Sequence, residues 1–144
     1  MSPMGFTGNI RKSSSIFLLI CFSFSSFQTT KACHETDQAA LLDFKSKIID
    51  DGPYKRLGTW SKDGDCCTHW DGVACDHSNG RVIHVIRPGL FSRPDGVLDI
   101  GYMIGTISPS LGNLKFLQIL NLNHLKKLNG SIPSELGNKL KADR

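Results

Sequence analysis

Apolar residues form one continuous stretch near the N-terminus and recur periodically in the rest of the chain. Residues 16–27 are a run of 12 mostly apolar residues, preceded by Arg11 and Lys12 and by no acidic residue. The run is shorter than the roughly 20 residues that cross a bilayer, and small residues follow it. We therefore expect residues 1–32 to be a secretory signal peptide cut after Ala32, with an uncleaved signal anchor as the alternative.

The first periodic segment, residues 36–49, predicts an amphipathic helix. Its apolar positions are spaced i, i+3 and i+7: Leu41, Phe44 and Ile48. This spacing places them on one helical face, which we expect to pack against a core. Thr36 or Asp37 can cap the N-terminus, and Gly52-Pro53 is a stop signal.

A strand pair is expected next. Residues 72–75 and 81–86 flank a turn that contains Asn79-Gly80, and Asn-Gly is a strong hairpin signal. Residues 88–103 contain Pro-Gly and Pro-Asp-Gly sequences and are expected to form a surface loop.

The C-terminal third repeats itself. Residues 105–113 align with residues 130–138 at an offset of 25, within the period of leucine-rich repeats. Leu117, Leu120 and Leu122 follow the L-x-x-L-x-L pattern of such repeats. Because Leu120 and Leu122 are two residues apart, alternation along a strand points both into a stack, and Asn121 and Asn123 onto an exposed concave face.

A repeat of this kind buries its apolar side only against its neighbours, and about three are needed for a stable stack. The chain has one complete repeat and part of a second. We therefore expect a fragment or a truncated product with an open C-terminal edge.

Four cysteines remain after the signal peptide, because Cys21 lies in the apolar run. An even number in an exported chain indicates disulfides. A bond between adjacent Cys66 and Cys67 is disfavoured because their Cα atoms lie too close together. Two pairings survive, and we prefer Cys33–Cys66 with Cys67–Cys75 because its second loop is short.

The charge of the exported part gives no support to nucleic-acid binding. Without Arg11, Lys12 and Lys31, 14 of the 17 basic residues remain against 13 acidic ones, and the two signs are interspersed. A zinc site at Cys66-Cys67-x-His69 with Cys75-x-His77 is disfavoured, because the spacing fits no standard finger and export favours oxidation. No catalytic or nucleotide-binding motif is found, so we expect neither enzyme activity, nor a cofactor, nor a metal.

Residues 33–138 resemble the N-terminal capping domain and first repeats of plant leucine-rich-repeat proteins, among them polygalacturonase inhibitors, receptor-like proteins and kinases. The motif residues are Cys33, Ala40-Leu41-Leu42-x-Phe44-Lys45, Leu57-x-x-Trp60, Cys66-Cys67-x-x-Trp70-x-Gly72-Val73-x-Cys75-Asp76 and Gly80-Arg81-Val82. Gly101-Tyr102-Met103-x-Gly105-x-Ile107 looks most like the DNA-damage-repair/toleration type. The resemblance implies the start of an α/β leucine-rich-repeat solenoid and the same cysteine pairing as above.

This resemblance implies a capping domain of helix and hairpin at 33–87, the loop at 88–103, repeats at 104–140 and a tail at 141–144. Arg87 departs from the family pattern, because it stands where the last inward apolar residue of the hairpin would fall.

The implied function is that of an extracellular binding or scaffold protein. Its ligand would be a protein, a peptide or a cell-wall polysaccharide, with no nucleic acid and no membrane span in this chain. The alternatives are a polygalacturonase-inhibitor-like defence protein and the ectodomain start of a receptor-like kinase. Candidate ligand contacts are the outward strand positions Gln118, Asn121, Asn123 and His124. Asn129-Gly130-Ser131 is a sequon, so Asn129 is a candidate glycosylation site.

Overall fold

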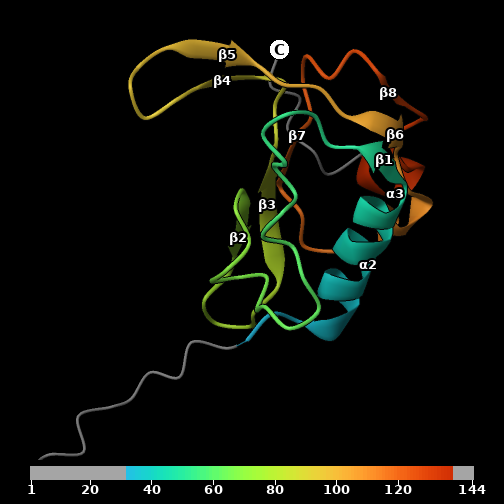
Figure 1. The fold of residues 1–144 in the computed structure, drawn as a ribbon. Coiled ribbons are helices and arrows are strands. Elements are labelled where there is room, and N and C mark those ends of the chain that lie inside the picture. Colours follow the sequence, from blue (N-terminus) through green and yellow to red (C-terminus); the bar gives the residue numbers. More distant parts are fainter. Residues whose placement is uncertain (1–31, 138–144) are drawn as a thin grey trace, which may run out of the picture.

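The computed structural model describes residues 32–137, so the expected signal peptide, its cleavage site and the C-terminal tail lie outside the described residues. The elements are α2 (Glu35–Ser46), β1 (Ile48–Asp50), β2 (Val73–Cys75), β3 (Val82–Ile86), β4 (Leu90–Ser92), β5 (Leu98–Ile100), β6 (Ile104–Thr106), the 3-10 helix η1 (Pro109–Asn113), β7 (Ile119–Asn121), β8 (Leu128–Asn129) and α3 (Ser134–Gly137). Figure 1 shows α2 on one side and β2 and β3 on the other, with the β4–β5 hairpin projecting away from α2. The strands form sheets of order β2-β3-β7 and β1-β6-β8, and the hairpin β4-β5.

Helix α2 forms as expected but is shorter than predicted. The buried positions of its inner face are Asp37, Ala40, Leu41 and Phe44. Its N-cap is His34, whose Nδ1 accepts a hydrogen bond from the Thr36 amide at 3.3 Å, so neither predicted cap is used. The helix ends at Ser46 because Ile48, predicted to be helical, is in β1 and pairs with Gly105 of β6. Two adjacent β-branched isoleucines favour a strand where a partner is available, and this partner is distant in sequence.

The predicted hairpin of residues 72–75 and 81–86 is confirmed as β2 and β3, which pair antiparallel. Gly80 ends the connecting turn with φ +68°, a left-handed conformation that glycine adopts without strain. Strand β3 then pairs in parallel with β7, which places Val85 beside Leu120. The capping hairpin and the first repeat therefore share one sheet.

The segment predicted to be a loop contains a second hairpin, so that prediction was wrong in part. In this hairpin Leu90 pairs with Ile100 and Ser92 with Leu98. The expected turn at Pro94-Asp95-Gly96 forms its tip, where the Arg93 amide donates to the Val97 carbonyl. The turn was recognised from the sequence, but the alternation of Leu98, Asp99 and Ile100, which is typical of a strand, was missed.

One apolar core joins the cap to the repeats. Trp60 and Trp70 stack in it with ring centroids 5.3 Å apart, and the Trp60 ring also contacts Phe44. The repeat contributes Leu111, Leu114, Leu117 and Leu136, all buried. Leu120 and Leu122 pack against this core as predicted, although both remain partly exposed.

Candidate ligand-binding face

Two disulfides hold the cap in place, and they have the pairing preferred from the sequence. Cys33 is bonded to Cys66 with Cα atoms 5.4 Å apart, and Cys67 to Cys75 with Cα atoms 5.3 Å apart. The sulfur atoms of Cys33, Cys66 and Cys67 lie within 4.8 Å of one another, which is a spacing that can hold a metal ion. Because these sulfurs are in disulfide bonds, they are not the thiolates that zinc requires.

A buried ion pair fixes helix α2 to the start of β3. The Asp37 carboxylate accepts hydrogen bonds from Arg81 Nη2 at 2.7 Å and Nε at 2.9 Å, and from the Val82 amide at 2.9 Å. The guanidinium of Arg81 also lies 4.6 Å from the ring centre of Phe116, which comes from the repeat. Bidentate geometry of this kind is specific as well as strong, so it sets the position of β3 relative to the helix and the repeat.

Strands β3 and β7 present one continuous outer face. Along β3 the buried Val85 points into the core, so its neighbours His84 and Ile86 point the other way. Val82 is also buried, and a shift in the β2–β3 register separates it from His84. The parallel register sets His84 beside Ile119 and Ile86 beside Asn121. This strand face combines an imidazole, an amide and two isoleucines, of which Ile86 is exposed and the other three residues are half-buried.

Of the four candidate ligand residues named from the sequence, one lies in strand β7 and three lie outside it. Asn121 is in β7, whereas Gln118 precedes that strand and donates its amide to the Ile83 carbonyl. Asn123 is exposed beyond the strand, and its amide donates to Asn121 Oδ1 at 3.2 Å. His124 is not a strand position as expected, because it adopts φ +63° in the turn that follows.

The sequence interpretation missed His84, Ile86 and Ile119 as members of this face. The signal for the first two was present, because alternation around Val85 places its neighbours His84 and Ile86 on the opposite side of the strand. Their proximity to Ile119 depends on the β3–β7 register, which the sequence of a single strand does not specify.

Arg87 supports the face from beneath instead of contributing a charge to it. Its amide donates to the Asn121 carbonyl at 2.7 Å, and its side chain is buried on the inner side. Burial lowers the pKa of Arg87 and the positive charge of Arg56 lowers it further, while Asp71 and Asp51 oppose this shift. Asp71 is the nearest acid, with an oxygen 3.9 Å from Arg87 Nη2. The inward position predicted for Arg87 is thus observed.

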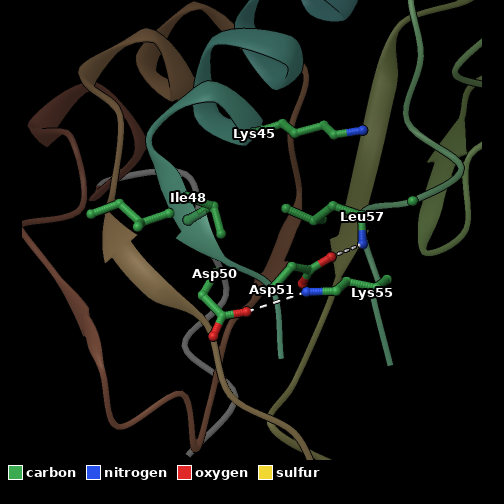
Figure 2. A pocket seen from close by; sticks show the side chains of 8 residues that line it. Lys45, Ile48, Asp50, Asp51, Lys55 and Leu57 are labelled. Carbon is green, nitrogen blue, oxygen red and sulfur yellow. Dashed lines mark hydrogen bonds and ion pairs between the residues drawn. The ribbon is translucent and has the colours of Figure 1, made fainter. Parts of the chain in front are cut away.

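A pocket of about 400 Å³ lies beside β1 (Figure 2). Most of its polar side-chain atoms bond within the protein. Lys45 Nζ donates to the Trp60 carbonyl at 2.6 Å, and Lys55 pairs with Asp50 at 3.4 Å. Asp51 accepts from the Leu57 amide, and burial raises the pKa of Asp51. Both lysine amines and the Asp50 carboxylate are thus engaged within the protein, whereas Asp51 Oδ1 is buried without a hydrogen-bond partner among the described residues.

The predicted sequon residue Asn129 lies in β8, away from the strand face. β8 is an edge strand of the sheet β1-β6-β8, and both Asn129 and Ser131 are exposed. Thr106 of β6 pairs with Asn129, and the Asn129 carbonyl accepts from the Ile107 amide. These bonds involve the backbone and leave the Asn129 side chain accessible.

Within residues 32–137, no helix is long and apolar enough to cross a membrane.

A family model for the leucine-rich-repeat N-terminal domain matches residues 34–76. The chain is 34% identical to the DNA damage-repair/toleration protein DRT100 of Arabidopsis thaliana over 81% of this chain and 32% of that protein. It is 32% identical to the receptor-like protein EIX2 of Solanum lycopersicum over 85% of this chain and 12% of that protein. The LRR receptor-like serine/threonine-protein kinase EFR of Arabidopsis thaliana is also 32% identical, over 85% of this chain and 10% of the kinase.

Two solved structures share the fold. A plant ice-binding protein superposes with a TM-score of 0.57 at 32% identity, over 74% of this chain and 30% of that chain. The structure titled PEPR1-AtPEP1 superposes with a TM-score of 0.50 at 30% identity, over 74% of this chain and 14% of that chain. The expected solenoid start with a disulfide-bonded cap is therefore confirmed. The chain spans about a third or less of the length of the curated relatives reported above.

Proposed function

Because the chain is a plant leucine-rich-repeat protein with a leucine-rich-repeat N-terminal domain, we propose that it is a secreted, non-catalytic binding module. Its ligand is an extracellular peptide or an extended segment of a protein, bound on the outer face of β3 and β7. The register that sets His84 beside Ile119 and Ile86 beside Asn121 carries this proposal. An imidazole and an amide supply hydrogen bonds to a peptide backbone, and the isoleucines supply apolar contact, which is the mixture typical of recognition surfaces.

A receptor ectodomain is the second candidate for the whole protein. It is favoured by matches to a receptor-like protein and a receptor kinase, each over a small part of the longer protein. A polygalacturonase-inhibitor-like role remains the soluble alternative from the sequence. Sequence downstream of residue 144 in the full transcript distinguishes them, since a receptor requires an apolar span of roughly 20 residues there.

The binding proposal is tested by selecting displayed random 12-residue peptides on the exported chain and titrating each selected peptide. The variant His84→Ala/Ile119→Ser removes the centre of the face, and Ile49→Ser, an isoleucine 85% exposed on β1, is the control. We expect the double variant to weaken binding by about tenfold or more, equivalent to about 1.4 kcal/mol, and the control to bind as wild type. Equal affinities in all three proteins, or no selected peptide, would refute the proposal.

A further inference from the structure

The outward face of the β4–β5 hairpin carries three aliphatic residues together with Ser92, and all four are exposed in the structure of residues 32–137. Leu90 is 40% exposed, Leu98 66% and Ile100 71%. The strand register places these three side chains on one side of the hairpin. Leu90 pairs with Ile100, and Leu98 lies two residues before Ile100 in the same strand. We call these three residues the apolar shelf.

The opposite side of the hairpin holds it to the cap. Phe91 packs edge-on against Tyr54 with ring centroids 5.3 Å apart, and the Arg56 guanidinium lies 4.3 Å from the Phe91 ring centre. On the same side Asp99 accepts a hydrogen bond from the Tyr54 hydroxyl. A two-stranded hairpin is marginally stable alone, so these contacts position it and leave the shelf facing outward.

The apolar shelf follows the outer face of β3 after a short connection, residues 87–89. The parallel hydrogen bonds extend past the end of β3, where the Arg87 amide donates to Asn121 and the Gly89 amide to Asn123. Over this extension Arg87 and Gly89 are buried, while Ile86 and Leu90 are exposed. Strand alternation thus places Ile86 and Leu90 on the same side of the chain.

Charge and size indicate what kind of partner fits. The three shelf side chains carry no charge, and the ionic groups of the hairpin pair with one another, because Arg93 pairs with Asp95 at 2.5 Å and with Asp99 at 3.5 Å, which leaves one negative charge in excess. The uncharged aliphatic side chains of the shelf complement apolar groups of a partner. Three partly exposed aliphatic side chains also provide far less than the roughly 800 Å² per partner of a standard stable interface, which argues against a dimer formed through the shelf alone.

We propose that the apolar shelf is a second recognition site for the ligand of the strand face. One extended peptide lies along β3 and β7 and places apolar side chains on Leu90, Leu98 and Ile100. This inference rests on the proposed function and adds a sequence preference to it, namely aliphatic or aromatic residues at one end of the bound peptide.

The test uses the peptides selected on the exported chain and the variant Leu98→Ser/Ile100→Ser, again with Ile49→Ser as control. Both changed residues are exposed, so we expect an unaltered denaturation midpoint. We expect a roughly tenfold or greater loss of peptide affinity in the shelf variant, and none in the control. Replacing the apolar end residues of a peptide with serine should weaken binding to wild type and not to the shelf variant.

Hydrogen exchange of the wild-type chain gives a measurement that does not depend on any variant. Bound peptide should slow exchange in residues 90–100 as well as in β7, and leave β1 unchanged. One outcome overturns this inference and leaves the proposed function intact. In that outcome, peptide binding requires His84 and Ile119 but is unaffected in the shelf variant, and bound peptide does not slow hydrogen exchange in residues 90–100. Absence of any bound peptide overturns both. Self-association that the shelf variant abolishes, measured by sedimentation, would identify a second copy as the occupant and also overturn the inference.

Discussion

Removal of the Asp37 carboxylate should destabilise the protein more than any other single loss of an ion pair among the described residues. Asp37 is completely buried, and its two oxygens accept three hydrogen bonds, two from Arg81 and one from the Val82 amide. The variant Asp37→Ala leaves a guanidinium that is only 14% exposed without its counter-ion, and a buried amide without an acceptor. Breaking a buried pair from one side costs about 3 to 5 kcal/mol.

That loss is large compared with the roughly 5 to 15 kcal/mol that stabilises an ordinary domain. The assay is guanidinium denaturation of the exported chain with its disulfides intact, followed by tryptophan fluorescence. Asp95→Ala is the matched control, because Asp95 also pairs with an arginine at 2.5 Å but its side chain is 54% exposed. Solvent screens such exposed pairs, so we expect little change in the control. Equal midpoint shifts in the two variants would refute the reasoning that burial makes the Asp37 pair important.

Three further predictions concern other parts of the molecule. Hydrogen bonds from Ser108 and Ser110 lower the pKa of Asp43 below its ordinary 3.8, so its contribution to stability is present above that value and is lost as pH falls through the lower folded pKa. Asp43→Asn should therefore lower the denaturation midpoint at pH 7 and reduce its dependence on pH below about 4, whereas an unchanged pH profile would contradict this. Gly72→Ala should destabilise by more than about 1 kcal/mol in the same assay, because Gly72 has φ +74° and an added Cβ would lie 2.4 Å from the Ile86 carbonyl oxygen. Treatment with a glycosidase should shift the gel mobility of the chain exported from plant cells. Asn129→Gln should abolish this shift, whereas Asn113→Gln, which changes an exposed asparagine outside any sequon, should not.

The sequence predicted those parts of the fold that depend on local pattern. Periodic apolar residues located α2, the Asn-Gly turn located β2 and β3, and the 25-residue offset located the repeat. Spacing left two disulfide pairings open and favoured the observed one because its second loop is short, and the family resemblance implied the same pairing. These signals are carried by neighbouring residues, so they are visible without any partner.

The missed features depend on pairing between distant residues. Ile48 lies in a strand because Gly105 of β6 is beside it, and the sheet β1-β6-β8 was not anticipated at all. The β4–β5 hairpin is fixed by Phe91 packing on Tyr54 and Arg56, contacts that span more than 30 residues. Of the strand face, Asn121 was named from its repeat position, whereas Ile119 was not matched to His84 because that requires the β3–β7 register.

Two disulfides close the cap over the first repeat, and the fold and the proposed binding face both depend on that cap. The most direct test is to determine, by partial reduction, stepwise alkylation and mass spectrometry, the disulfide bonds of the chain collected from the medium of plant cells. The account predicts a chain that begins after Ala32 and contains Cys33 bonded to Cys66 and Cys67 bonded to Cys75. Free thiols at these four positions, or a chain retained in the cytosol, would contradict it.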